Sequence, residues 1–287
     1  MVIKDMKKLQ KFHFVHMPHL KVVPTEKVIL HESFDAKRTH ALKKKIAQSG
    51  VWKDPPIVTT LPDGRYLVLD GANRTTSMKA LRMPHMLVQV VDYFDPSIEL
   101  RSWNHVVRVS RDHLVNVLQN GDGKAFKPMS DRRAKKMLAY KQILAYFCSR
   151  DGKCMAIPLQ STPRAAIDLL NRLVESYEGK SVIHRTEEAT RKAFQGLGSF
   201  MNTLIVFPGL TKLGLLNAIA RGQYLPSGIS RHLIFRRALR VYLPLSVLRS
   251  QKLSIKQKQA QVDRMISEKF TQGQVRFYPE GIYLFDE

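Results

Sequence analysis

The sequence predicts a protein of the α+β class, and three observations support this prediction. Residues 20–91 alternate short β-branched runs with segments of helical spacing, and the chain after residue 112 carries longer amphipathic helical patterns. Of the 287 residues, 44% are hydrophobic, which is enough to bury a core and excludes a disordered or collagen-like chain. We therefore expect one large domain or two smaller ones.

Strands are predicted in the first part of the chain wherever apolar and β-branched residues form a short run. These runs are Leu20–Pro24, Val28–Leu30, Pro56–Thr60, Arg65–Leu69 and Met86–Val91. The turn-forming triplet Pro62-Asp63-Gly64 joins the third run to the fourth. Helical spacing covers Arg38–Gln48, which Gly50 ends, and Thr75–Arg82. Together these elements predict a compact α+β domain over residues 1–112.

Helical spacing dominates the rest of the chain. Apolar residues recur at three- and four-residue intervals over Asp131–Phe147, Pro163–Tyr177, Glu187–Phe194 and Ile255–Phe270. Arg237–Leu243 fits a strand, and Gln274–Phe285 alternates around a Pro-Glu-Gly turn as a β-hairpin does. Gly121-Asp122-Gly123 fits a linker or an exposed loop. The sequence thus predicts a second, mostly helical domain over residues 113–287 that ends in a β-hairpin.

The chain is strongly basic, with 47 Lys and Arg residues, 24 Asp and Glu residues and a formal net charge of +23. Such a balance favours anionic partners such as nucleic acid, nucleotides, phosphorylated metabolites or an acidic membrane face. Two basic stretches follow residue 112: Arg132, Arg133, Lys135, Lys136 and Lys141 on one predicted helix, and Arg231, Arg236, Arg237 and Arg240 farther on. Each stretch fits either a solvated face or a contact with DNA through the basic C-terminal part.

Cysteine content and hydropathy indicate the compartment. The two cysteines, Cys148 and Cys154, are too few for a disulfide scaffold, and we expect reduced thiols. The N-terminus has no apolar signal-peptide core, and the most apolar stretch, Met201–Ala220, is interrupted by polar residues. We therefore expect a cytoplasmic protein that makes no membrane contact. The sequence leaves a homodimer open.

The first candidate site is an Asp-Gly turn between a predicted buried strand and a helix, in Asp70-Gly-Ala-Asn-Arg-Thr-Thr76. Free backbone amides and the helix dipole at such a turn favour a phosphate or carboxylate. Gly71 permits a close backbone approach, Arg74 adds a forked cation, and Asp70 could hold Mg²⁺ beside a phosphate. The same pattern also fits a turn aspartate at a helix start, with Arg74 paired to a surface acid.

Glu32, in His31-Glu32-Ser33-Phe34, is the second candidate because it directly follows a short strand. A carboxylate there could accept a proton from a substrate hydroxyl, although the pattern of Glu32 alone favours a solvated surface acid. Trp103 and His105, in Ser102-Trp-Asn-His105, fit either a site or a core.

These motifs in combination resemble a known family. Leu30–Phe34, Arg38, Pro55–Thr59 and Gly64–Leu81 resemble the ParB/sulfiredoxin-like fold, and more closely the free L-serine kinases of that fold. Those kinases include an archaeal ADP-dependent enzyme and the ATP-dependent one of staphyloferrin B-type siderophore clusters. The likeness continues through Ser102–His105, Leu225–Arg231 and the closing Val275–Phe285, so it covers most of the chain.

The resemblance implies a role for each matching residue. Glu32 would be the general base on the serine hydroxyl, and Asp70 the second essential carboxylate, near Mg²⁺ and the transferred phosphoryl group. The phosphates of ATP or ADP would lie against Gly71, Ala72, Asn73, Arg74, Thr75 and Thr76. Residues implied on the substrate side are Trp103, which would help to form the serine pocket, His105 and Arg231.

One departure bears on the activity. The family pattern often has His where this chain has Asn73, and Asn donates a hydrogen bond but carries no proton charge. With that exception, the resemblance implies an Mg²⁺-dependent kinase that transfers phosphate from ATP or ADP to free L-serine and forms O-phospho-L-serine, and the residue types suit phosphoryl transfer. The alternative is a ParB-like DNA-binding transcriptional regulator or partition protein.

Overall fold

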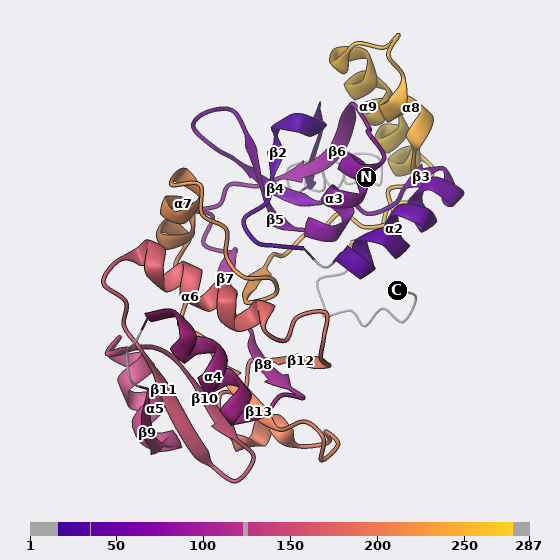
Figure 1. The fold of residues 1–287 in the computed structure, drawn as a ribbon. Helices are drawn as coiled ribbons and strands as arrows, with labels where there is room; N and C mark the ends of the chain where they lie inside the picture. Colours follow the sequence, from indigo (N-terminus) through magenta and orange to yellow (C-terminus); the bar gives the residue numbers. More distant parts are fainter. Residues whose placement is uncertain (1–16, 35, 123–125, 278–287) are drawn as a thin grey trace, which may run out of the picture. The chain divides into compact units, whose positions relative to one another are not determined.

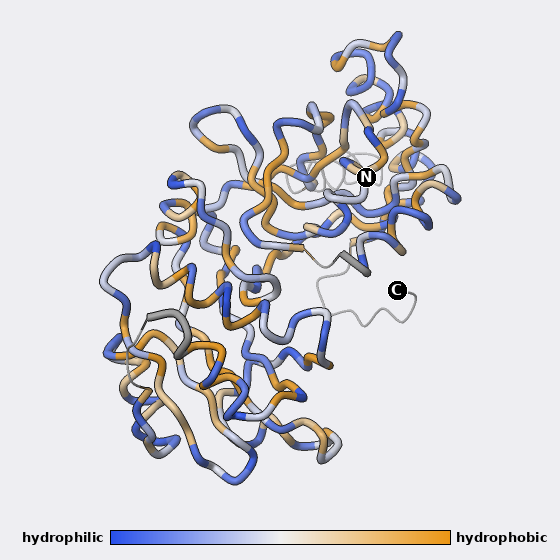
Figure 2. The backbone as a smooth tube through the Cα atoms, viewed as in Figure 1, coloured by the Kyte–Doolittle hydropathy of each residue, from blue (hydrophilic) through white to orange (hydrophobic). Residues whose placement is uncertain are grey.

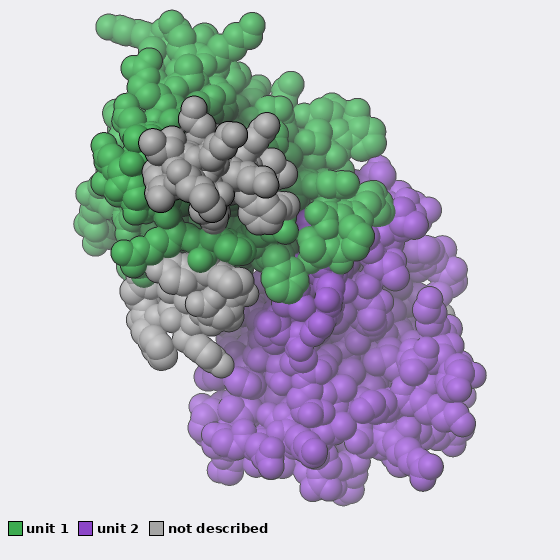
Figure 3. Space-filling view, turned by 180° about the vertical axis from the view of Figure 1, so that it is seen from behind, with its two compact units in different colours: residues 1–29, 38–97, 234–287 green, residues 30–37, 98–233 purple. Residues whose placement is uncertain are grey.

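The computed structural model describes residues 17–34, 36–122 and 126–277 (Figure 1). The chain forms two compact units (Figure 3). Unit 1 comprises residues 1–29, 38–97 and 234–287, and unit 2 comprises residues 30–37 and 98–233. Each unit therefore draws segments from both of the ranges, 1–112 and 113–287, into which the sequence divides.

Unit 1 is built on a five-stranded sheet in the order β1-β6-β4-β5-β2. Its strands are β1 His19–Pro24, β2 Val28–Ile29, β4 Ile57–Thr60, β5 Tyr66–Asp70 and β6 His85–Val90. The central strand β4 is antiparallel to β5 and parallel to β6. All residues of β5 except Asp70 are buried. The only polar residue of this strand, Asp70, therefore lies at its carboxyl end, where the chain leaves the core.

Helices and a small strand pair complete unit 1. They are the short η1 Thr25–Lys27, α2 Ala36–Ser49, α3 Ala72–Ala80, α8 Leu245–Arg249 and α9 Ile255–Thr271, with β3 Val51–Trp52 paired to β15 Leu243–Pro244. A capping box between Ser254 and Gln257 begins α9, which lies against β1, while α8 lies against β6. The buried indole of Trp52 donates to the carbonyl oxygen of Leu87 at 2.8 Å, which ties β3 to β6.

Unit 2 contains a six-stranded sheet in the order β12-β8-β13-β10-β11-β9. Its strands are β8 Asn104–Val107, β9 Lys127–Ser130, β10 Ile143–Ser149, β11 Lys153–Pro158, β12 Ile183–Thr186 and β13 Thr203–Val206. A separate pair joins β7 Glu99–Ser102 to β14 Ser230–Leu233. The helical elements are α4 Arg111–Asp122, α5 Asp131–Ala139, α6 Pro163–Glu175, η2 Arg191–Phe194 and α7 Lys212–Ala220. In Figure 2 the hydrophobic colour follows the inner strands of both sheets.

The α+β class predicted from the sequence is confirmed, and so are the five predicted strands of the first sheet. The predicted helix over Asp131–Phe147 is wrong in its second half, because α5 ends at Ala139 and β10 begins at Ile143. All but the last residue of β10 are buried, and a continuous apolar run does not distinguish a buried strand from a helix. Residues after 112 consequently carry more sheet than the sequence indicates.

Two smaller predictions also change. Glu187–Phe194 contains only the short 3-10 helix η2, and Arg237–Leu243 is irregular up to the last residue, where β15 begins. The predicted terminal hairpin lies mostly outside the described residues, since the description ends at residue 277.

Among the described residues, no helix is both long and apolar enough to cross a membrane.

The prediction of reduced thiols is wrong in this structure, because Cys148 and Cys154 form a disulfide. The two residues face each other in the register of β10 and β11, with Cα atoms 4.0 Å apart. Both are buried in the core cluster of unit 2. The tight turn between the two strands brings the cysteines opposite each other, which the count of cysteines alone does not reveal.

Candidate functional site

Glu32 lies in a short segment that the chain contributes to unit 2. The segment pairs with Leu225 through a parallel bridge at Glu32, and the backbone N–H of Leu225 donates to the carbonyl oxygen of His31 at 2.9 Å. The N–H of Ser33 donates in turn to the carbonyl oxygen of Leu225 at 3.1 Å. The backbone around Glu32 is therefore fixed against the start of the Leu225–Arg231 stretch. Leu225 lies 193 positions after Glu32 in the chain.

Ser230 connects Glu32 to His31. Its hydroxyl donates to Glu32 Oε2 at 2.7 Å, and its Oγ also lies 2.7 Å from His31 Nε2. A serine hydroxyl has one proton, so His31 Nε2–H donates to Ser230, and the bonds run from imidazole to hydroxyl to carboxylate. The His31 side chain is 3% exposed and that of Glu32 17% exposed, which leaves the carboxylate accessible at the end of a buried support. Neither His31 nor Ser230 was expected from the sequence to have a role at the site.

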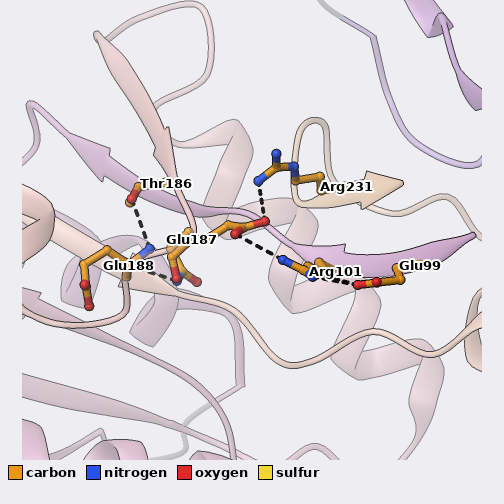
Figure 4. Close-up of polar contacts among 7 residues, drawn as sticks. Glu99, Arg101, Thr186, Glu187, Glu188 and Arg231 are labelled. Atoms are coloured by element: carbon orange, nitrogen blue, oxygen red, sulfur yellow. Dashed lines mark hydrogen bonds and ion pairs between the residues drawn. The ribbon is translucent and has the colours of Figure 1, made fainter. Parts of the chain in front are cut away.

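Trp103 and Arg231, both predicted on the substrate side, lie together. The Arg231 guanidinium stacks 4.2 Å from the centre of the Trp103 ring. Arg231 also pairs with Glu187, which Arg101 approaches to 3.5 Å, and Arg101 pairs with Glu99 at 2.7 Å (Figure 4). This row of alternating charges on β7, on β14 and directly after β12 holds the guanidinium over the indole face.

His105 lies in the interior of unit 2 and contacts the loop that leads into β14. It is fully buried, and its ring lies 2.8 Å from the Tyr177 hydroxyl and 2.9 Å from the carbonyl oxygen of Gly228. A carbonyl only accepts, so Nε2–H donates to Gly228 and Nδ1 accepts from Tyr177. Burial lowers the pKa of His105 to about 4, although the bond to Gly228 opposes the shift. Both ring nitrogens are engaged, so this residue is placed to position the loop that carries Ser230 rather than to touch a substrate.

In unit 1, the turn between β5 and α3 has the geometry of an anion site. Gly71 has a φ of 98° and precedes the first residue of α3, Ala72. The N–H of Thr75 donates to the carbonyl oxygen of Gly71 at 2.9 Å, which is the first bond of the helix. The amides before Thr75 have no acceptor within the helix, and the helix dipole is positive at this end.

Asp70 is paired with two arginines at this turn. Arg74 lies 2.7 Å from its Oδ2, and Arg237, which sequence reasoning did not assign to the site, contacts the same oxygen. Burial acts to raise the pKa of Asp70, but the two guanidinium groups outweigh it and the pKa is lowered. Asp70 is therefore ionised at neutral pH. Arg74 pairs with the turn aspartate itself, not with a separate surface acid.

The other predicted phosphate-binding residues have different surroundings. Asn73 Oδ1 accepts from the Thr39 hydroxyl at 3.1 Å, and the Thr76 hydroxyl donates to the carbonyl oxygen of Ala72 at 3.0 Å. Thr75 is fully buried, so its hydroxyl belongs to the interior of unit 1. The donors left at the turn are thus the backbone amides, the Arg74 guanidinium and the side-chain NH₂ group of Asn73. From the resemblance we also expect the carboxylates of Glu32 and Asp70 to meet across one small cleft. Glu32 belongs to unit 2 and Asp70 to unit 1, so this stays a prediction.

We expect Gly71→Ala to lower the free energy of unfolding by about 2 kcal/mol, because a Cβ there meets Pro56 Cβ and an Arg74 nitrogen, each at 2.9 Å, at a positive φ. Gly64→Ala is the matched control, since its φ is also positive but nothing lies within 4 Å of its Cβ. That variant should lose only about 1 kcal/mol. Urea titration measures the free energy of unfolding of both variants. An equal decrease in the two would contradict the predicted clash at Gly71.

We expect His105 to make the folded state sensitive to acid. Its folded-state pKa of about 4 lies below the ordinary value of 6.5, so the unfolded chain takes up a proton first as the pH falls. The neutral imidazole contributes fully to the free energy of unfolding above pH 6.5. As the pH falls from 6.5 to 4, up to about 3 kcal/mol of this contribution is lost. Urea titrations of wild type and His105→Gln across this window should show a shallower pH dependence in the variant. Parallel curves would contradict the buried neutral imidazole.

Comparisons with known proteins agree with the motifs. No family model matches the sequence. The chain is 26% identical over 270 residues to the ATP-dependent L-serine kinase SbnI of Staphylococcus aureus, a match that covers 94% of this chain and 98% of the relative. An ATP-dependent L-serine kinase of Staphylothermus marinus is 34% identical over 99 residues, which cover 34% of this chain and 39% of that protein.

Solved structures share the fold. A C-terminally truncated SbnI from Staphylococcus aureus matches with a TM-score of 0.70 and 24% identity, over 88% of this chain and 97% of that one. A free serine kinase in complex with AMP matches with a TM-score of 0.67 and 18% identity, over 81% of this chain and 94% of that one. The resemblance predicted from the motifs is confirmed: the chain is a homologue of the ATP-dependent L-serine kinases and has the fold of the free serine kinases.

Proposed function

We propose that this protein is an ATP-dependent kinase that phosphorylates free L-serine. The observation that carries the proposal is the match to an L-serine kinase over 94% of the chain, which includes every candidate site residue. In the reaction, a bond forms between the serine Oγ and the γ-phosphorus of ATP, and the bond from that phosphorus to the bridging oxygen breaks. The products are O-phospho-L-serine, ADP and a proton. ATP is favoured over ADP as donor by the names of the relatives.

Glu32 is the base that would receive the proton. A serine hydroxyl becomes a stronger nucleophile as its proton moves to a carboxylate in the transition state. Ser230 and His31 hold one carboxylate oxygen, Oε2, in a fixed direction, so the other oxygen is available to the substrate. The stacked Arg231 would pair with the carboxylate of the amino acid, beside Trp103.

The turn after β5 would bind the phosphates of the nucleotide. Backbone amides at the start of α3 and the Arg74 guanidinium supply hydrogen-bond donors and positive charge without any covalent step, as phosphoryl transfer requires. Asn73 takes the place of the family histidine. Its Oδ1 accepts from Thr39, so the side-chain NH₂ group is the donor that Asn73 would present to a phosphate.

The residues present fit a magnesium ion. Both arginines contact Asp70 through Oδ2, and the other carboxylate oxygen, Oδ1, is a hard ligand of the kind that Mg²⁺ takes together with phosphate oxygens and water. Asp70 would hold the ion, which when bound neutralises phosphate charge. A cytoplasmic location, a homodimer and DNA contact through the basic C-terminal part remain predictions from the sequence alone.

We expect the purified protein to convert L-serine and ATP to O-phospho-L-serine in the presence of Mg²⁺, detected by mass spectrometry, with ADP tested in parallel. Glu32→Gln and Asp70→Asn should each lower turnover by about 10²-fold or more. Asp168→Asn is the control, because this exposed acid of unit 2 pairs with Arg164 on the same helix, α6, away from the candidate site residues. No product from folded protein with either nucleotide would refute the proposed function.

We expect Ser230→Ala to lower kcat by about tenfold while the KM for ATP stays unchanged, because the variant removes the donor that orients Glu32. Ser230→Thr keeps a hydroxyl and should restore most of the activity. Ser102→Ala is the matched control, since Ser102 faces Ser230 across the β7–β14 pair and donates instead to Pro208. Wild-type turnover in Ser230→Ala would show that Glu32 needs no such support.

A further inference from the structure

An irregular segment of unit 1, residues 235–242, has a strained backbone. Arg236, Arg240 and Tyr242 have φ values of 58°, 56° and 55°. This left-handed region is rare and energetically costly for residues with a side chain. A regular strand, which the sequence indicated here, would avoid that cost. The surrounding contacts must therefore hold the segment in this shape.

Two side chains of unit 1 fix the segment. Gln89, which is 2% exposed on β6, donates to the carbonyl oxygen of Arg236 at 2.9 Å and accepts from the N–H of Ala238 at 2.8 Å. Asp54 accepts from the N–H of Arg240 at 2.7 Å. The bonds to Gln89 bracket Arg237, so the residue between them has a defined backbone position.

Arg237 brings a second guanidinium to the start of α3. Asp70, at the end of β5, pairs with Arg237 and with Arg74 through one oxygen. Two positive groups thus share one negative group beside the positive end of a helix, and the cluster has an excess of positive charge. The Arg237 side chain is 39% exposed, and a guanidinium has five N–H donors, more than Asp70 Oδ2 can accept. The remaining donors are suited to phosphate oxygens.

We propose that Arg237 is a phosphate-binding residue that contacts the β- or γ-phosphate of the nucleotide together with Arg74, and that Asp70 holds both arginines in position for it. This inference rests on the proposed function, because it assigns a residue to the same nucleotide site. It gives Asp70 a positioning role in addition to that of a magnesium ligand. It also explains why unit 1 maintains a strained segment opposite the Asp-Gly turn.

The test is calorimetric titration of the full chain with ATP, ADP and AMP in the presence of Mg²⁺ and without serine. Arg237→Met keeps the length of the side chain but removes the charge and the donors. We expect this variant to bind ATP about tenfold more weakly and AMP with an affinity within about twofold of wild type, because AMP lacks the distal phosphates. Arg237→Lys should fall between Arg237→Met and wild type.

Arg236→Met is the matched control, because it removes the same charge from the neighbouring position, and its ATP affinity should stay within about twofold of wild type. Equal weakening of ATP in the two variants, equal weakening of ATP and AMP in Arg237→Met, or unchanged ATP affinity in Arg237→Met would each overturn the role of Arg237. A wild-type chain that binds none of the nucleotides would overturn the proposed function as well. If Arg237→Met does not fold, Arg237→Lys, which keeps the ion pair with Asp70, is titrated in its place. It should bind ATP more weakly than wild type while its AMP affinity is unchanged, and wild-type ATP affinity would overturn the role of Arg237.

Discussion

The carboxylate at the end of β5 is the constraint on which the candidate nucleotide site depends. Asp70 emerges from a buried strand, and the next residue, Gly71, turns the backbone directly into α3. A charge at that place is costly to bury unless it is paired, and two guanidinium groups pair with it. The same pairing fixes both arginines beside the free amides of the helix. One acid therefore organises the cations, the turn and the irregular 235–242 segment.

In unit 2, a network of hydrogen bonds similarly fixes the position of Glu32. His105 is buried and neutral, and it holds the carbonyl group of Gly228 two residues before Ser230. Ser230 in turn joins the buried imidazole of His31 to the accessible carboxylate of Glu32. A bond network of this kind gives a reactive side chain a fixed orientation without enclosing it. The accessible candidate residue Glu32 is thereby supported by buried residues behind it.

Sequence reasoning was most successful where a pattern is local. The strand–Asp-Gly–helix turn follows from hydrophobic runs and turn chemistry, and the structure has it at the expected place. Arg237 and Ser230 were not recognised as partners of Asp70 and Glu32, because these pairs join positions 167 and 198 apart and only the folded chain brings them together. His31 was missed because it reaches Glu32 through Ser230, which lies 199 positions away. The buried strand β10 was read as a helix because its apolar run lacks the alternation of a half-exposed strand.

The order of the segments along the chain bears on how the protein is made at the ribosome. All residues of unit 2 have been synthesised once position 233 has left the peptidyl-transferase centre, whereas unit 1 still lacks β15, α8 and α9. Asp70 and Arg74 exist early, but the guanidinium that completes their cluster arrives 167 positions after Asp70. The strands of both sheets are thus synthesised before Arg237, and the candidate anion site is among the last parts to be completed.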